Sequence, residues 1–203
     1  MASSLFSRPF FRFYRALWTL AFPFLKRNAR LSDGWNERLA PDDWLEPDLP
    51  RRNGRCADIW IQAASGGEAR LAVAICQNFR PDATLRVLVT TWTRQGRDVV
   101  EKALPALRQS HPHLMAAVRF APLDHPDVIR RALSLARPRL VALLETELWP
   151  GLLASCREMN IPVQVFNGRI NSSTAHFGRL FSSLMTDISP AVIHAVSRYD
   201  KQG

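Results

Sequence analysis

The stretch from Trp60 to Ile75, WIQAASGGEARLAVAI, shows how this chain is built. It begins as an apolar segment of strand length and continues directly into a segment whose apolar residues recur at helical spacing. Two glycines and a glutamate stand between the two parts. This is the pattern of a βα unit, and the same pattern recurs along the chain.

Apolar runs of strand length alternate with helix-sized segments from residue 57 to the end of the chain. Such alternation is typical of βαβ units and a parallel sheet. The sequence therefore predicts an α/β fold, a Rossmann-like parallel sheet of about six strands with helices on both faces. The predicted strands lie in ADIWIQAAS, TLRVLVTTW, MAAVRFAPL, RLVALLE, PVQVFN and VIHAVS.

Composition argues for a globular protein with an uneven charge. The 203 residues are 47% hydrophobic and 22% charged, which is close to ordinary globular usage and makes disorder a poor explanation. The net charge is +9, and no acidic residue precedes Asp33. This asymmetry indicates a basic N-terminal segment with a role of its own rather than a uniformly basic surface that binds nucleic acid. We therefore expect no nucleic-acid partner.

Residues 1–30 interleave aromatic side chains with arginines, and we interpret them as a membrane-anchor segment. Aromatic rings suit the headgroup boundary of a bilayer, and guanidinium groups suit anionic lipid. The longest uncharged run, Ala16 to Leu25, is about half of the ~20 residues that a spanning helix needs. The alternative is an aromatic-rich helix that packs on the domain. Residues 31–56 then form a connecting region, and residues 57–203 form the domain.

The three cysteines are far apart and form no metal-ligand spacing with histidines. We therefore expect no metal site, no cofactor and a reducing compartment.

Ligands of open parallel sheets bind outside the carboxyl ends of the strands. Five predicted loops leave those ends, and all are rich in polar or small residues, as a shared cleft requires. They are SGGE, TTWTRQG, PLDHPD, ETELWPG and NGRINSS.

The SGGE loop has two interpretations. Ser65 and Glu68 match the S-x-x-E capping box, in which the two side chains satisfy the first amides of a helix. Alternatively, Glu68 is a general base aimed at a substrate hydroxyl, and Gly66 and Gly67 allow a tight turn and close approach of a ligand. The loop lacks the third glycine of a dinucleotide-binding motif, and local reasoning favours the cap.

Other loops supply further candidates for binding. Glu145 and Glu147 follow an apolar strand directly, and Pro150 fits the first turn of the next helix. Arg169 is suited to bind a carboxylate or a phosphate. Arg94 could bind the same kind of anion, or its guanidinium could simply face solvent. The remaining candidates are Thr91 and Asn167.

The ordered blocks resemble the N-terminal half of the 3-deoxy-D-manno-octulosonic acid (Kdo) transferases. The resemblance covers nearly the whole chain, including the basic aromatic N-terminus and the SDGWNERL stretch that follows it. Its most specific piece is ETELWP. The other blocks are IWIQAASGGE, VLVTTWTRQG, APLDHP, IPVQVFNGRINSST and the closing IHAVS.

The resemblance implies the acceptor-binding half of a GT-B glycosyltransferase at the cytoplasmic face of the inner membrane. It implies inverting transfer of Kdo from CMP-Kdo to a lipid A precursor, lipid IVA, in lipopolysaccharide biosynthesis, without a metal. Glu68 matches the family's proposed general base. The acceptor-binding residues implied are Ser65, Gly66, Gly67, Thr91, Arg94, Glu145, Glu147, Asn167 and Arg169.

The chain departs from the family pattern at three points. Gly66 stands at or next to the usual Val, and Gly151 stands where Asn is usual. The chain also ends at Gly203, where a donor-binding domain is expected to begin. We therefore expect the isolated chain to be inactive, either as one part of an enzyme completed by a separate donor-binding domain or as a non-catalytic acceptor-binding domain.

Overall fold

The computed structural model describes residues 9–145, 148–168 and 192–195, and its centre is a parallel sheet of six strands. The strand order is β3-β2-β1-β4-β5-β6, which is the order of doubly wound dinucleotide-binding folds. This confirms the predicted Rossmann-like sheet. The strands are β1 Ile59–Ala63, β2 Leu85–Thr91, β3 Leu114–Phe120, β4 Leu140–Leu144, β5 Val163–Gly168 and β6 Val192–Ala195.

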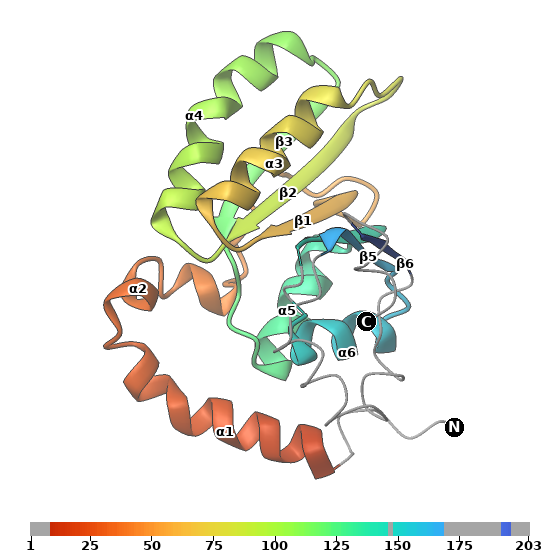
Figure 1. The fold of residues 1–203 in the computed structure, drawn as a ribbon. Coiled ribbons are helices and arrows are strands. Elements are labelled where there is room, and N and C mark those ends of the chain that lie inside the picture. The colour runs from red at the N-terminus through yellow and green to blue at the C-terminus, as the bar shows by residue number, and fades with distance from the viewer. Residues whose placement is uncertain (1–8, 146–147, 169–191, 196–203) are drawn as a thin grey trace.

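Helices cover both faces of this sheet, as predicted. Figure 1 shows α3 and α4 together on one face and α5 and α6 on the other, with α1 along the bottom of the view. The helix-sized segment between the fifth and sixth predicted strands, residues 174–185, lies outside the described residues. The helices are α1 Pro9–Leu25, α2 Ala29–Ser32, α3 Gly66–Asn78, α4 Arg94–Ser110, α5 Pro126–Ala136 and α6 Pro150–Glu158, and a 3-10 helix, η2, spans Glu37–Leu39.

The strands are apolar on both faces because each face packs against a helical layer. In β1, Trp60 belongs to the core beneath α5 and α6, and its neighbour Ile61 belongs to the core beneath α3 and α4. This alternation follows from the two-residue period of a strand. It explains why the strands appear in the sequence as continuous hydrophobic runs.

Residues between α1 and β1 pack into the core beneath α5 and α6. Trp44 and Leu49 are buried beside Trp60, and the Trp44 and Trp60 ring centroids are 5.5 Å apart. The division of the chain at residues 30 and 56 stays a prediction.

Arg38, in η2, is a fully buried arginine that stabilises the start of the domain. Its guanidinium donates to the carbonyl oxygen of Trp92 at 2.8 Å and lies 4.5 Å from the centroid of the Phe120 ring. Burial lowers the pKa of Arg38 to about 10, which leaves it charged at neutral pH. A buried charge needs such partners, because without them its transfer out of water costs on the order of several kcal/mol.

All three cysteines, Cys56, Cys76 and Cys156, are free and buried. Burial raises the pKa of Cys76 to about 12, and it also raises the pKa of Cys156.

Candidate active site

The SGGE loop joins the carboxyl end of β1 to α3, and Ser65 is the N-cap of that helix. The Ser65 hydroxyl accepts the Glu68 amide hydrogen at 3.5 Å and donates to Glu68 Oε1 at 3.0 Å. The other carboxylate oxygen of Glu68 accepts a hydrogen bond from the Ala64 amide. The capping interpretation is therefore confirmed, with Glu68 reaching back one residue beyond the cap.

The cap leaves Glu68 able to accept a further proton or hydrogen bond. Its side chain is only 7% exposed and is fixed at the edge of the sheet where ligands bind in this fold class. Each carboxylate oxygen accepts one described hydrogen bond, although a carboxylate offers about four acceptor positions. The capping and base interpretations are thus compatible in the same side chain.

The two glycines of this loop lie in the first turn of α3 rather than in a separate tight turn. A Cβ atom at Gly66 would lie 3.2 Å from the Gln95 side chain, whereas one at Gly67 would meet nothing nearer than Ser65 Oγ at 3.7 Å. Close packing against α4 therefore constrains Gly66, and Gly67 has room for a side chain.

Thr91 and Arg94 flank the next loop, after β2. Thr91 is fully buried and its hydroxyl donates to the Thr93 carbonyl oxygen at 3.3 Å. Arg94 is exposed, and its Nε lies 3.2 Å from Asp33 Oδ2. A ligand anion at Arg94 would therefore compete with a carboxylate of this chain.

Glu145 and Asn167 end neighbouring strands at the same level of the sheet. They follow Leu144 and Phe166, which are paired across β4 and β5, and the Glu145 amide donates to the Phe166 carbonyl oxygen at 2.8 Å. Both residues have left-handed backbone, with φ of 60° at Glu145 and 58° at Asn167. Such backbone is costly for residues other than glycine and concentrates at functional sites. Glu147 and Arg169 lie outside the described residues.

Asp124, in the loop after β3, is a central residue that the sequence analysis did not single out. It is 1% exposed, and its carboxylate accepts hydrogen bonds from the Gly151 and Leu152 amides, each at 2.8 Å. The Tyr14 hydroxyl donates to the same carboxylate at 2.6 Å. Burial raises the pKa of Asp124 to about 7, although these three hydrogen bonds oppose the rise. Asp124 thus joins α1 to the first turn of α6.

Gly151 has a packing role beside this carboxylate. A Cβ atom at Gly151 would lie 2.5 Å from the Asp124 carbonyl oxygen and 2.9 Å from its Oδ1. No larger side chain fits without movement of the backbone. Pro150 occupies the first position of α6, as predicted.

Two tryptophans connect the loops that follow β2 and β4. The rings of Trp92 and Trp149 are 4.9 Å apart between centroids. Aromatic contacts of this kind contribute about 1 kcal/mol beyond the burial of their area. The pair therefore holds the TTWTRQG and ETELWPG loops against each other.

The inner face of α1 packs on the carboxyl edge of the sheet. Phe11 is buried, Thr19 Oγ1 lies 3.2 Å from His125 Nε2, and Arg15 pairs with Asp127 at 2.8 Å. The alternative interpretation of this segment, a helix that packs on the domain, agrees with these contacts, and the membrane-anchor interpretation stays a prediction.

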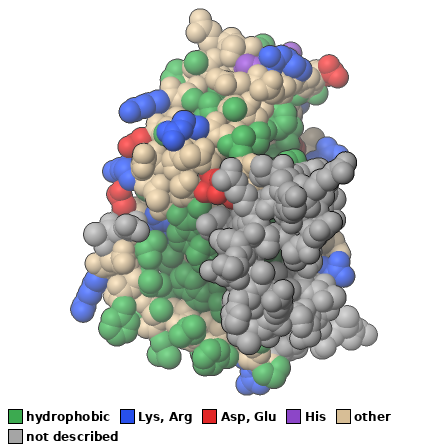
Figure 2. Space-filling model, in the orientation of Figure 1, with side chains coloured by type: hydrophobic (Ala, Val, Ile, Leu, Met, Phe, Trp, Pro, Cys, Tyr) green, Lys and Arg blue, Asp and Glu red, His purple; other side chains and the backbone are tan. Residues whose placement is uncertain are grey.

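The outer face of α1 exposes a stripe of large apolar side chains. They are 52–73% exposed and follow a spacing of four, three and four residues, which places them on one side of a helix. Figure 2 shows hydrophobic side chains along the bottom of the view, where α1 lies in Figure 1. The stripe consists of Phe13, Leu17, Leu20 and Phe24.

The described residues contain neither a membrane-spanning helix nor a cluster of metal ligands. None of the described helices has the length and hydropathy needed to cross a bilayer. The described His, Cys, Asp and Glu side chains include no group of three or more that could hold a metal ion.

Comparison with known proteins gives consistent matches. A family model described as 3-deoxy-D-manno-octulosonic-acid transferase (kdotransferase) matches residues 21–202. The chain is 31% identical over 181 residues to the "Probable 3-deoxy-D-manno-octulosonic acid transferase, mitochondrial" of Arabidopsis thaliana. It is 28% identical over 189 residues to the 3-deoxy-D-manno-octulosonic acid transferase of Bordetella pertussis.

These matches cover most of this chain but less than half of each relative. They span 86% of the chain and 37% of the Arabidopsis protein, and 93% of the chain and 43% of the Bordetella protein. A 3-deoxy-D-manno-octulosonic acid transferase of Haemophilus influenzae is 34% identical over 63% of the chain and 29% of its own length.

Proposed function

This chain belongs to the Kdo transferase family, and from that premise we propose that it is the acceptor-binding N-terminal part of a Kdo transferase. The complete GT-B enzyme would transfer Kdo from CMP-Kdo to a lipid A precursor, lipid IVA, in lipopolysaccharide biosynthesis. The observation that carries the proposal is the placement of Glu68: a buried carboxylate, fixed by its own loop, at the ligand-binding edge of the sheet.

In the proposed reaction, Glu68 is the general base. Its carboxylate accepts the proton of an acceptor hydroxyl while that oxygen attacks the anomeric carbon of Kdo. The bond from this carbon to the phosphate oxygen breaks, CMP leaves with the electron pair, and the configuration inverts. Fixing the base before the substrate arrives removes the entropy cost of aligning it. Proton transfer of this kind contributes about 10²- to 10⁴-fold to a rate.

The other residues at this edge would shape the acceptor side of the cleft. Glu145 and Asn167 support this role by their left-handed backbone at adjacent strand ends. Ser65 fixes the base through its hydroxyl. We assign acceptor binding also to Gly66, Gly67, Thr91, Arg94, Glu147 and Arg169, as the family resemblance implies.

Transfer requires the two substrates to meet in one cleft. The matched part is less than half of each relative, and we propose that a second domain supplies the CMP-Kdo site. We therefore expect no turnover from residues 1–203 alone. The test is a chimera in which this chain replaces the matched part of the Bordetella enzyme, assayed with CMP-Kdo and lipid IVA.

Glu68→Gln in that chimera is expected to lower kcat by about 10²- to 10⁴-fold, because the amide cannot accept the proton. The amide is nearly isosteric with the carboxylate, and circular dichroism would verify that the fold is kept. Glu101→Gln is the matched control: it makes the same change on the exposed surface of α4, where Glu101 pairs with Arg97, so most of the activity should remain.

Equal turnover of the Glu68→Gln and parent chimeras would contradict the base role. A chimera that binds lipid IVA but shows no turnover with either residue at position 68 would instead favour a non-catalytic acceptor-binding domain.

We further propose that α1 binds the cytoplasmic face of the inner membrane. Its apolar stripe faces away from the domain, and Arg12, Lys26 and Arg27 are exposed on the same helix or directly after it. A helix with an apolar side and flanking basic residues lies in the plane of the membrane–water interface, with its apolar side chains below the lipid headgroups. The acceptor, a lipid, would then reach the sheet edge from the surface on which α1 rests.

Vesicle flotation with anionic phospholipid tests this membrane role. Leu20→Asp/Phe24→Asp is expected to weaken binding by about a hundredfold, because two buried apolar side chains contribute about 3 kcal/mol. The control, Gln77→Asp/Gln109→Asp, adds the same charge on α3 and α4 and should bind nearly as well as the parent. Equal weakening in both variants would show that charge alone governs binding.

A further inference from the structure

We propose that a cavity at the amino ends of β1, β4 and β5 binds a soluble small molecule that carries at least two phosphate charges. The cavity has a volume of about 600 Å³, within the range of small-molecule sites. Three chain segments form it, each shortly before a strand. Its lining residues are Asn53, Gly54 and Arg55, then Arg137, Pro138 and Arg139, then Met159, Asn160, Ile161 and Pro162.

The first wall of this cavity is a rigid turn. Arg52 and Arg55 exchange backbone hydrogen bonds of 2.7 and 3.0 Å, and the residues between them, Asn53 and Gly54, have φ of 51° and 78°. Two left-handed residues in succession are characteristic of a type I′ turn, for which Asn-Gly is the preferred sequence. The direction in which Arg55 leaves this turn is therefore fixed by the backbone.

Arg86, at the start of β2, stabilises this turn through hydrogen bonds to its backbone. Its Nη1 donates to the carbonyl oxygens of Arg52 at 3.2 Å and Arg55 at 2.8 Å. Its Nη2 pairs with Asp58 Oδ1 at 3.1 Å, and its side chain is only 9% exposed. The buried guanidinium thus has a structural role, and it satisfies the nearest carboxylate.

The second wall carries the other two arginines. Arg137 is the C-cap of α5 in left-handed conformation, with φ of 47°. A Cβ atom at Gly54 would lie 3.6 Å from Arg137 Nη1, so the two walls approach each other at this point. The Arg139 amide donates to the Asp58 carbonyl oxygen at 2.8 Å. The backbone that presents these side chains is therefore held by hydrogen bonds.

The cavity concentrates positive charge that the described residues do not neutralise. It has no acidic lining residue, and no ion pair among the described residues involves Arg55, Arg137 or Arg139. Burial of Asp58 opposes its ionisation, but the hydrogen bonds from Arg86 and the charge of Arg139 lower its pKa. This single carboxylate is already paired with Arg86, so it does not balance the charge of the three exposed arginines.

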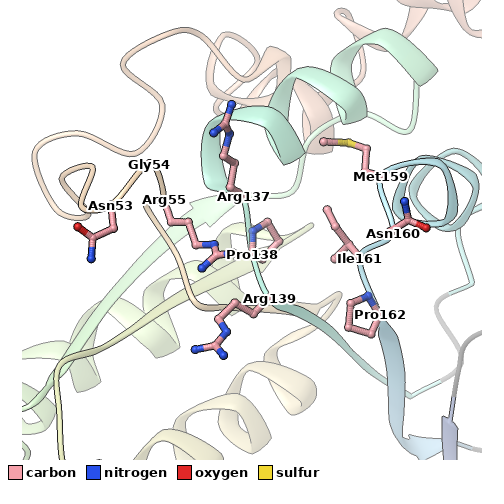
Figure 3. A pocket seen from close by; sticks show the side chains of 10 residues that line it. All are labelled: Asn53, Gly54, Arg55, Arg137, Pro138, Arg139, Met159, Asn160, Ile161 and Pro162. Carbon is pink, nitrogen blue, oxygen red and sulfur yellow. The ribbon is translucent and has the colours of Figure 1, made fainter.

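The chemistry of the lining indicates phosphate. Guanidinium groups bind phosphate through two parallel hydrogen bonds, and Asn53 and Asn160 offer amide donors beside them. Figure 3 shows the arginines on one side and Met159, Ile161 and Pro162 on the other. One side therefore suits a charged group, and the other suits an apolar or ring portion of the same ligand.

This site lies at the opposite edge of the sheet from Glu68 and Asp124, because parallel strands have all their amino ends at one edge. The proposal is therefore independent of the transferase proposal, and either can fail while the other stands.

Isothermal titration of the full chain with inorganic pyrophosphate and tripolyphosphate, in 0.15 M salt to screen long-range attraction, tests the site. We expect saturable one-to-one binding that Arg137→Gln/Arg139→Gln weakens by about tenfold or more, since charge-assisted hydrogen bonds are lost. Arg108→Gln/Arg131→Gln removes the same charge elsewhere on the described surface and should change the affinity less than about twofold. Arg55→Gln is a second test if the double variant unfolds.

Three results would overturn the proposal. The first is equal weakening in the control variant, which would indicate general attraction of anions. The second is no saturable binding of either probe. The third is a loss of anionic-vesicle binding in Arg137→Gln/Arg139→Gln without a loss of pyrophosphate binding, which would make lipid phosphate the ligand.

Discussion

The candidate sites at the two edges of the sheet differ in the sign and the exposure of their charged side chains. At the carboxyl edge, Glu68 and Asp124 are buried, and hydrogen bonds from neighbouring amides and hydroxyls fix their carboxylates. At the amino edge, Arg55, Arg137 and Arg139 are exposed around a cavity that contains no acid. The polar groups of the first edge bind one another, whereas those of the second edge are available to a ligand.

The parallel fold itself explains this separation. In a βαβ unit a strand is followed by the N-terminus of a helix, where the helix dipole favours carboxylates, and the next strand is preceded by the C-terminus of that helix, where the dipole favours cations. Glu68 and Asp124 lie at the N-termini of α3 and α6, and Arg137 follows the C-terminus of α5. The helix dipoles therefore favour Glu68 and Asp124 at one edge and Arg137 at the other.

The strongest test of close packing at the carboxyl edge is Gly151→Ala. The new methyl group would lie 2.5 Å from the Asp124 carbonyl oxygen, so the start of α6 must move. We expect the free energy of unfolding, measured by urea denaturation, to fall by about 3 kcal/mol.

Gly67→Ala is the matched control, because Gly67 occupies the same second position in α3 and has no neighbour within 3.7 Å. Alanine is the better helix former, so this variant should be as stable as the parent or more stable by up to about 1 kcal/mol. Equal destabilisation by both substitutions would show that close packing at Gly151 is not the cause.

A smaller effect is expected from the titration of Asp124. Its pKa is about 7 in the folded chain and about 3.9 in an unfolded one, so the native state binds more protons between these values. The stability contributed by this group is therefore present at low pH and declines as pH rises through this range. Between pH 5 and pH 8 the decline should be about 2–3 kcal/mol.

Urea denaturation of the parent and Asp124→Asn at both pH values measures this decline, because the asparagine does not titrate. The difference in stability between the two proteins should shrink from pH 5 to pH 8. Tyr14 and Cys156 also interact with Asp124, but their raised pKa values keep them neutral in this range. A difference that stays constant with pH would show that Asp124 is ionised throughout.

The sequence predicted the parts of the structure that depend on local pattern. The strands follow from apolar runs, the start of α3 from the spacing of Ser65 and Glu68, and the start of α6 from Pro150. The strand ends then placed Glu68, Glu145 and Asn167 at one edge of the sheet without any knowledge of contacts.

Contacts between residues that are far apart in the sequence could not be predicted from local pattern. Tyr14 and Asp124 are separated by 110 positions, and Arg38 and Ala121 by 83. Nothing in the local sequence marks Asp124 as different from any aspartate in a polar loop, because its role comes from the two amides of α6 that it meets. The arginines of the amino edge were overlooked for the same reason, since three separate segments bring them together.

The burial of every cysteine in the chain gives a practical means of watching α1. Thiolates react with maleimides, and buried thiols react slowly. A Leu20→Cys variant would therefore carry one readily labelled position, with no native cysteine removed. A fluorophore there would report, in real time, whether the helix stays on the domain or lifts away when vesicles are added.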